Sequence, residues 1–285
     1  MIETNFFLTY PDGLKVSCTI RLPLGKEQLN PIIVGHGFRG FKDWGFFPYL
    51  CKQLSNAGFA VISFNHALSG ISNNPLEIDD TESFSKNSTS QELLDWQLVM
   101  DNLLGGDFPY LERLRLNALG IFGHSRGGSY GILFSRQILQ VQSIVTWGAI
   151  KTFERFDSAT CQQWKREGIL RIGSTKQGRP LELKVKALED LENNLDQLDV
   201  IQAIRQLSIP ALILHGRNDK VVSLSEAKQL WKCSDQKLSA FHIIEGSGHT
   251  FHTQHPLVIT SPALKEAVDK TISWFKNTLS SKKYL

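Results

Sequence analysis

A Gly-x-Ser-x-Gly pentapeptide at residues 123–127 constrains the fold of this chain more than any other feature. It lies between an apolar run, 118–122, and a run with helical spacing, 128–139. A buried strand that enters a tight turn and continues directly into a helix raises the serine above the C-terminal edge of a sheet. The glycines allow neighbouring elements to approach the turn closely. The pentapeptide therefore predicts a strand–turn–helix unit with Ser125 at its apex.

Short apolar runs alternate with helical patterns over most of the sequence. The predicted strands are Thr4–Tyr10, Leu14–Leu22, Pro31–Gly35, Phe59–Phe64, Ala118–Phe122, Gln142–Trp147, Ile209–Leu214 and Ala240–Ile244. The predicted helices are Phe46–Asn56, Gln91–Leu104, Gly128–Leu139, one that begins at a Ser223-x-x-Glu226 capping box, and Pro262–Leu279. Residues 69–88 are polar and predict a long loop. We therefore expect an α/β fold: a mostly parallel sheet of about eight strands with helices on both faces, whose first two strands form an antiparallel hairpin.

Residues 151–207 interrupt this alternation. The segment has no apolar strand pattern, many charges and two helical stretches, Phe156–Glu167 and Leu181–Gln206. It is longer than an ordinary connection between two elements. The sequence therefore predicts a helical cap inserted over the strand edges, between a first core segment at 1–150 and a second at 208–285.

The composition is that of an ordinary globular protein and excludes several function classes. Of 285 residues, 41% are hydrophobic and 21% charged. The net charge is only +3 and no long Lys/Arg run occurs, which argues against nucleic-acid binding. No apolar run approaches the roughly 18 residues that a membrane span needs. Residues 1–7 lack the basic flank of a secretory signal, and the four cysteines lack metal-site spacing, so we expect a cytoplasmic protein without a metal.

A serine hydroxyl is a weak nucleophile at neutral pH and needs a base, which in turn needs an orienting carboxylate. Two predicted strand ends downstream of Ser125 supply them: Asp219 follows 209–214, and His249 follows 240–244. This order of serine, acid and histidine is that of folds with a nucleophile turn after a strand. We therefore expect Ser125, Asp219 and His249 to form a catalytic triad. His252 and His255 are alternative bases, but neither lies next to a strand end.

Hydrolysis through an acyl-enzyme also needs donors for the developing oxyanion. The glycine-rich stretch 36–40 follows the predicted strand 31–35, so a backbone N–H from it can face the serine. We expect the donors to be the backbone amides of Phe38 and of Arg126, the residue after the serine. The side chains of these two residues are not expected to be donors.

Four motifs together resemble those of the α/β-hydrolase superfamily. They are His36-Gly37-Phe38-Arg39-Gly40, Gly123-His124-Ser125-Arg126-Gly127-Gly128, His215-Gly216-Arg217-Asn218-Asp219 and Gly246-Ser247-Gly248-His249. Within the superfamily the chain is similar to bacterial members of the dienelactone-hydrolase and acyl-peptidase-like group, and its cap resembles that of cinnamoyl and feruloyl esterase-like proteins. The resemblance covers nearly the whole chain and implies ester hydrolysis without metal or organic cofactor. One departure is Asn65-His66-Ala67, which replaces the acidic or arginine-rich turn often found after that strand.

The charges of the cap suggest a substrate preference. Residues 151–179 hold seven basic and three acidic side chains, whereas 180–205 hold three basic and six acidic ones. The two parts could pair with each other as solvated helix faces. Alternatively, Arg155, Lys165 or Arg171 could bind an acidic part of a substrate.

Aromatic residues could line an acyl pocket. Trp147 ends a predicted strand beside the nucleophile and Trp164 lies in the cap, so with Phe38 they are candidate substrate-binding residues. Each is equally compatible with a position in the core.

We therefore predict a serine hydrolase, monomeric or homodimeric, that cleaves small to medium carboxylic esters. A peptidase or amidase with the same triad is the nearest alternative, and Glu154 or Glu167 facing the pocket would favour it. A non-catalytic binding protein on the same fold is a further alternative, but such proteins commonly lack one member of the triad.

Overall fold

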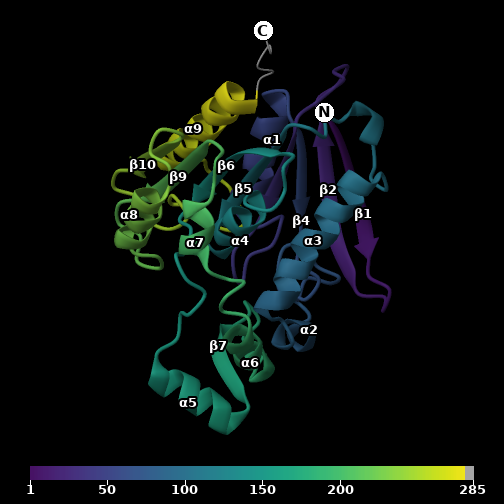
Figure 1. Ribbon diagram of the computed structural model, residues 1–285. Coiled ribbons are helices and arrows are strands. Elements are labelled where there is room, and N and C mark those ends of the chain that lie inside the picture. Colours follow the sequence, from purple (N-terminus) through teal and green to yellow (C-terminus); the bar gives the residue numbers. More distant parts are fainter. Residues whose placement is uncertain (280–285) are drawn as a thin grey trace.

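The computed structural model describes residues 1–279 and is built around one eight-stranded sheet (Figure 1). The order of the strands across this sheet is β1-β2-β4-β3-β5-β6-β9-β10. Their bounds are β1 Ile2–Thr9, β2 Lys15–Leu22, β3 Pro31–Gly35, β4 Ala60–Phe64, β5 Leu119–His124, β6 Val141–Trp147, β9 Ala211–Gly216 and β10 Ser239–Ile244. The predicted α/β class and the number of strands are confirmed, while residues 280–285 of the predicted second core segment lie outside the described residues.

The sheet is antiparallel at one edge and parallel elsewhere. Strands β1 and β2 form the predicted hairpin, and β2 pairs antiparallel with β4. The remaining pairs, from β4 to β10, are parallel. Strands β3, β4, β5 and β9 are buried along their whole length, which agrees with their uninterrupted apolar character and with coverage on both faces.

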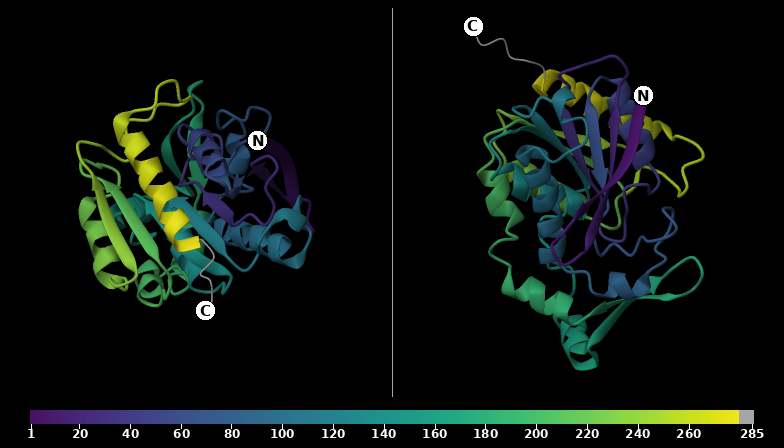
Figure 2. Two further views of the ribbon diagram at one scale, coloured as in Figure 1. Left: turned by 90° about the horizontal axis from the view of Figure 1, so that it is seen from above. Right: turned by 90° about the vertical axis from the view of Figure 1, so that its right-hand side faces the viewer.

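Helices cover both faces of the sheet. The core helices are α1 Phe47–Asn56, α3 Thr89–Gly105, α4 Arg126–Ser135, α7 Val200–Arg205, α8 Leu224–Cys233 and α9 Pro262–Leu279, and a 3-10 helix, η1, spans Leu111–Arg113. Helices α1 and α9 share one hydrophobic cluster, and α3, α4, α7 and α8 share the other. Figure 2 shows α9 crossing the sheet diagonally in the view from above. The two faces thus bury separate apolar cores.

The register of the parallel strands brings the loops that follow them to one edge. Gly35 at the end of β3 pairs with Gly123 near the end of β5. Gly216 at the end of β9 pairs with Ile244 at the end of β10. The loops that carry the candidate oxyanion donors, nucleophile, acid and base therefore leave the sheet on the same side.

Residues 151–207, the predicted cap, contain a β-hairpin and are not purely helical, which corrects the predicted helical composition; the name cap is kept for this segment. Its elements are α5 Ser158–Glu167, β7 Ile169–Ser174, β8 Pro180–Lys184 and α6 Lys186–Asn193. Gly168, with φ of 75°, ends α5 and admits the turn into β7. The predicted helix over 181–206 is wrong because Leu181 and Leu183 alternate with partly exposed residues, a two-residue period that β8 satisfies. The C-terminal part of that stretch, α7, packs on the core.

The cap lies beyond the C-terminal ends of the parallel strands, next to α2 Thr81–Ser85 (Figures 1 and 2). Helix α2 falls in the predicted loop 69–88, where Asp80 caps it by accepting a hydrogen bond from the Ser83 amide. Buried side chains of the cap and of this loop form a third hydrophobic cluster: Ile78, Phe84, Trp164, Leu181, Leu183 and Leu188. The cap thus has a small core of its own, to which the 69–88 segment contributes.

Candidate active site

Ser125 stands at a strained turn between β5 and α4. Its φ of 55° and ψ of −126° lie in a region that residues other than glycine rarely occupy. Its amide donates a hydrogen bond of 2.8 Å to the carbonyl of Trp147 at the end of β6. Such strain persists only where the surrounding structure enforces it, and it is typical of functional sites.

The glycines of the pentapeptide are needed for close packing around this turn. A Cβ atom on Gly123 would lie 2.3 Å from the carbonyl oxygen of Gly127. A Cβ atom on Gly127 would lie 2.4 Å from the carbonyl oxygen of His36. Any side chain at either position would therefore push α4 away from β5 or from the end of β3.

The candidate base and acid are hydrogen-bonded to each other. Nδ1 of His249 donates to Oδ2 of Asp219 over 2.7 Å, and the Asp219 side chain is fully buried. The other oxygen of Asp219 accepts from the amides of Val221 and Val222. This arrangement leaves Nε2 of His249 as the nitrogen with the free lone pair.

Asp219 remains ionised although it is buried. Burial alone would raise the pKa of its carboxyl group. The hydrogen bond from His249, the charge of His249 and the amides of Val222 and Val221 outweigh burial and hold the pKa below its ordinary value. An ionised Asp219 can stabilise positive charge on His249.

A second histidine, His124, supports the first. Its Nε2 donates to the carbonyl oxygen of His249 over 3.0 Å, and the two ring centroids are 4.5 Å apart. Burial, followed by the charge of His249, lowers the pKa of His124 to about 3, so it stays neutral. No local sequence pattern indicates this contact, because the two residues lie 125 positions apart.

The glycine-rich loop after β3 approaches the serine closely. A Cβ atom on Gly37 would lie 2.8 Å from Cβ and 3.4 Å from Oγ of Ser125. Gly40 closes the loop by donating its amide to the carbonyl of Gly37. Within residues 1–279, the amides of Phe38 and Arg126 donate no hydrogen bond to the protein. The two amides without a partner in this range thus belong to the residue after Ser125 and to the residue after Gly37, which approaches the serine.

A buried neutral histidine stabilises this loop. Nδ1 of His36 donates to the carbonyl of Gly37, and Nε2 accepts from the amide of His66. Burial, followed by the charge of His66, lowers the pKa of His36 to about 3. Asp95 in turn binds the His66 ring and the Ala67 amide. The Asn65-His66-Ala67 turn, which departs from the usual pattern, therefore anchors the loop.

We expect acid to unfold the protein partly through His36 and His124. Both have a folded-state pKa of about 3, whereas an unfolded histidine titrates near 6.5. Between these values only the unfolded state binds the protons, so stability falls as the pH drops from about 6.5 towards 3. Each group contributes a loss of up to about 1.4 kcal/mol per pH unit.

Urea unfolding at pH 7, 6, 5 and 4 measures this slope. The matched control is His252→Gln, which removes an exposed histidine instead of a buried one. A free energy of unfolding that is constant between pH 7 and pH 4 would contradict the assignment of neutral buried rings.

One pocket contains the candidate nucleophile and base. It encloses about 670 Å³, which is within the range of small-molecule sites. Its wall is formed by loop 37–40, the turn at Ser125, the cap, and the loops that carry Asp219 and His249. Its lining residues are Gly37, Phe38, Arg39, Gly40, Trp44, Phe47, His124, Ser125, Arg126, Ile150, Arg155, Phe156, Thr160, Leu170, Arg171, Ile172, Val221, Val222, His249 and Thr250. Only Phe38 of the three predicted aromatic residues is among them.

Trp147 and Trp164 do not line this pocket, which corrects their predicted role in substrate binding. Trp147 is fully buried beneath the site and its Nε1 donates to Thr271 of α9. Trp164 is 2% exposed, and its Nε1 donates to the carbonyl of Leu183 in the core of the cap. Their positions follow from the packing of α9 and of the cap hairpin, which no local sequence pattern reveals. Trp44, Phe47 and Phe156 are the aromatic lining residues that the prediction missed.

The three predicted cap cations have different positions. Arg155 and Arg171 line the pocket, whereas Lys165 is outside it and pairs with Glu192. Arg171 is mostly exposed and pairs with Glu182 of β8. The pairing of the basic and acidic halves of the cap is thus observed for two of the three.

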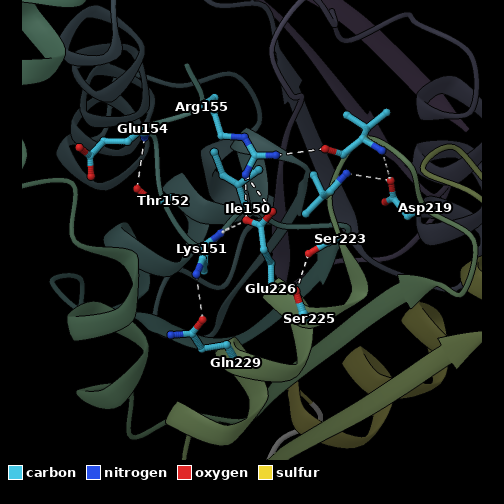
Figure 3. Close-up of polar contacts among 12 residues, drawn as sticks. Ile150, Lys151, Thr152, Glu154, Arg155, Asp219, Ser223, Ser225, Glu226 and Gln229 are labelled. Carbon is cyan, nitrogen blue, oxygen red and sulfur yellow. Dashed lines mark hydrogen bonds and ion pairs between the residues drawn. The ribbon is translucent and has the colours of Figure 1, made fainter. Parts of the chain in front are cut away.

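Arg155 connects the start of the cap to α8 and to the loop that carries Asp219 (Figure 3). Its Nη1 lies 2.9 Å from both carboxylate oxygens of Glu226, and its Nη2 donates to the carbonyl of Val221. Glu226 also accepts from the amide of Lys151. The predicted capping box is therefore not formed, and the Ser223 hydroxyl bonds to Ser225 instead.

Breaking this contact should loosen the start of the cap. For Glu226→Gln we expect the free energy of unfolding to fall by about 1–2 kcal/mol, because a partly buried ion pair becomes a weaker hydrogen bond to a neutral side chain. Amide exchange should accelerate over residues 149–157 more than in β3 or β5. Lys165→Gln, which breaks an exposed ion pair, is the control. It should lower the free energy of unfolding by less than about 1 kcal/mol. Equal exchange over 149–157 in wild type and Glu226→Gln would show that the pair does not anchor the cap.

Solved structures share this architecture over almost the entire chain. Est1E from Butyrivibrio proteoclasticus, in its structure with ferulic acid, has a TM-score of 0.73 at 17% identity and covers 97% of this chain and 100% of its own. A dienelactone hydrolase from Anabaena variabilis has a TM-score of 0.63 at 15% identity and covers 98% of both chains. The chain has the α/β-hydrolase fold. The predicted resemblance to dienelactone-hydrolase-like and feruloyl-esterase-like proteins is thereby confirmed at the level of structure.

Among curated proteins, this α/β-hydrolase-fold chain matches 2,6-dihydropseudooxynicotine hydrolase of Paenarthrobacter nicotinovorans. The two are 22% identical over 211 residues, which cover 74% of this chain. The chain spans half the length of that relative. No protein-family model matches the chain. Across residues 1–279, none of the helices is both long enough and apolar enough to cross a membrane.

Proposed function

We propose that this α/β-hydrolase-fold protein is a serine hydrolase that cleaves small to medium carboxylic esters. The observation that carries the proposal is the shared pocket of Ser125 and His249, in which buried Asp219 holds Nδ1 of the histidine. This is the arrangement that a weakly nucleophilic hydroxyl requires. The strained backbone of Ser125 supports the same role.

The first half of the proposed reaction transfers the acyl group to the enzyme. Oγ of Ser125 attacks the acyl carbon while Nε2 of His249 takes the hydroxyl proton. Asp219 stabilises the resulting imidazolium without accepting its proton. When the tetrahedral intermediate collapses, the bond to the alkoxy oxygen breaks and His249 gives its proton to the leaving alcohol.

The amides of Phe38 and Arg126 would stabilise the negative oxygen of that intermediate. Arg126 follows Ser125 in the chain, Phe38 follows Gly37, and neither amide has an acceptor in the described protein. A single donor of this kind contributes on the order of 3 kcal/mol to lowering the barrier. The close approach of Gly37 to Ser125 supports a short distance between the next amide, that of Phe38, and the serine.

The second half of the proposed reaction uses water. His249 removes a proton from a water molecule that attacks the acyl carbon, and the oxyanion forms a second time in the same place. Collapse of this intermediate breaks the bond to Oγ and returns the proton from His249 to Ser125. The carboxylic acid is then released.

The pocket favours an ester over a peptide. Among the residues that the structure describes, no acidic side chain lines the pocket to bind a peptide amino terminus. Glu154 and Glu167, whose orientation towards the pocket would favour a peptidase, are exposed and are not lining residues. No observation therefore favours the amidase alternative.

The test is a substrate panel combined with active-site labelling. We expect a fluorophosphonate probe to label wild type, and 4-nitrophenyl esters of two to eight carbons to be hydrolysed with a higher kcat/KM than aminoacyl 4-nitroanilides. Faster turnover of the anilides would support a peptidase instead. Absence of both labelling and turnover would favour a non-catalytic binding protein.

We further propose that the protein works in the cytoplasm as a monomer or homodimer, without a cofactor. Cys18, Cys51, Cys161 and Cys233 are all free thiols, which agrees with a reducing compartment. The proposed steps need only the side chains and amides named above. Unchanged ester turnover after dialysis against a chelator checks the cofactor proposal.

A further inference from the structure

The side chains of the two proposed oxyanion donors touch each other. The guanidinium carbon of Arg126 lies 4.2 Å from the centre of the Phe38 ring. This distance is within the range of an attractive cation–π contact. The residues belong to different elements, the loop after β3 and the first turn of α4, so the contact bridges the two backbones whose amides flank Ser125.

Arg126 is anchored from its other side. Its Nη1 is 3.5 Å from Oε2 of Glu92, and both side chains are largely buried, with exposed fractions of 12% and 4%. Glu92 lies in the first turn of α3 and accepts a hydrogen bond of 2.7 Å from Asn87. Burial would raise the pKa of Glu92, but the charge of Arg126, together with the charge of His66 and the hydrogen bond from Asn87, holds it below its ordinary value, so the carboxylate is ionised. The guanidinium is thus held by a fixed charge.

The Phe38 ring also lies next to an aromatic ring of α2. Its ring centre is 6.0 Å from that of Phe84 in α2, which belongs to the hydrophobic cluster of the cap. The next residue, Arg39, has a φ of 60°, a backbone conformation that is unfavourable for residues other than glycine. A loop with this local strain and no hydrogen bond at the Phe38 amide depends on side-chain contacts for its position.

We propose that the Arg126 side chain is a positioning residue for the oxyanion hole. By stacking on Phe38 and pairing with Glu92, it holds the amides of Phe38 and Arg126 at the separation that the oxyanion requires. The proposal rests on the proposed serine-hydrolase function and concerns the side chains, whereas the donors remain the backbone amides.

The chemistry of the arginine explains why a similar side chain would not suffice. A planar guanidinium presents one face to an aromatic ring and still offers N–H groups at its edge to a carboxylate. The lysine ammonium is a compact point charge that can pair with Glu92 but cannot stack on Phe38 in the same way. Methionine fills similar space and provides neither interaction.

The test compares Arg126→Lys, Arg126→Met, Phe38→Leu and the double variant Arg126→Met/Phe38→Leu with wild type. Rates on one 4-nitrophenyl ester are divided by the number of sites that a fluorophosphonate titrates, so unfolded molecules do not count. For Arg126→Met we expect kcat to fall about ten- to a hundredfold, part of the loss seen when a donor is removed, with KM changed less than about threefold. Arg126→Lys should recover only part of this loss.

Two further measurements separate positioning from a purely structural effect. The affinity for a boronic acid, whose tetrahedral adduct on Ser125 mimics the oxyanion, should fall in parallel with kcat. The pH profile of kcat/KM should not shift, because His249 and Asp219 are not altered. The double variant should be little slower than the slower single variant, since both substitutions break the same contact.

Arg21→Met is the matched control, because Arg21 is also a largely buried arginine that pairs with a glutamate, Glu3, but lies outside the pocket. It should leave kcat and boronate affinity within about twofold of wild type. The proposal is overturned if Arg126→Met retains the wild-type kcat, if only KM rises, or if the two single effects multiply in the double variant. A wild type that neither labels nor hydrolyses the ester would instead overturn the proposed function itself.

Discussion

Ser125→Ala is expected to lower kcat/KM for a 4-nitrophenyl ester by about 10⁴- to 10⁶-fold. Without Oγ no acyl-enzyme can form, and His249 has no hydroxyl to deprotonate. The remaining activity would come from the amides of Phe38 and Arg126 acting on a water-mediated reaction. Steady-state rates with wild type and variant, together with loss of fluorophosphonate labelling, measure this effect.

The substitution should leave the fold intact. The amide of residue 125 would still donate to the carbonyl of Trp147, and alanine is no larger than serine. A thermal midpoint close to that of wild type therefore serves as the control. A variant that is fully folded and hydrolyses the ester within tenfold of the wild-type rate would rule out Ser125 as the nucleophile.

Asp219→Asn is expected to lower kcat by about 10⁴-fold near neutral pH. The amide of asparagine can donate to Nδ1 of His249, which would move the ring proton to Nε2. That nitrogen could then not accept the proton of Ser125. The substitution also removes the negative charge that stabilises the imidazolium. The effect should appear in kcat more than in KM, because Asp219 does not line the pocket.

Asp79→Asn is a matched control for this substitution. Asp79 also accepts backbone hydrogen bonds in a turn, from the amides of Ser72, Asn73 and Asn74, but it lies outside the pocket. Asp79→Asn should leave kcat within about twofold of wild type. Equal losses from both substitutions would indicate that Asp219 matters only for the shape of its loop.

Much of the core could be predicted because its signals are local. A buried parallel strand needs an uninterrupted apolar run, and the runs at Pro31–Gly35 and Ile209–Leu214 correspond to β3 and β9. The Gly-x-Ser-x-Gly turn marks the end of β5, because the packing there leaves no room for a Cβ atom at Gly123 or Gly127. Elements with such strong local constraints were found within a few residues of their observed bounds.

The cap was predicted less well because its signals conflict. The stretch 181–206 is rich in helix-forming residues, yet its first residues pair with Ile169–Ser174 as β8. The hairpin is stabilised by contacts with Trp164, which lies 19 positions before Leu183, and with α2, whose Glu82 lies 102 positions before Lys184. Non-local packing of this kind overrides the helical propensity of single residues.

The sequence by itself determined the α/β class, the strand–turn–helix at Ser125 and the order in which Ser125, Asp219 and His249 follow their strands. Each depends on neighbouring residues or on the rule that parallel strands end at one edge of a sheet. Only the tertiary structure decided that Trp147 is buried, that Arg155 joins Glu226 and that Arg126 stacks on Phe38. The physical reason is that side-chain partners are chosen by packing between elements distant in the chain, and no spacing along the sequence records that choice.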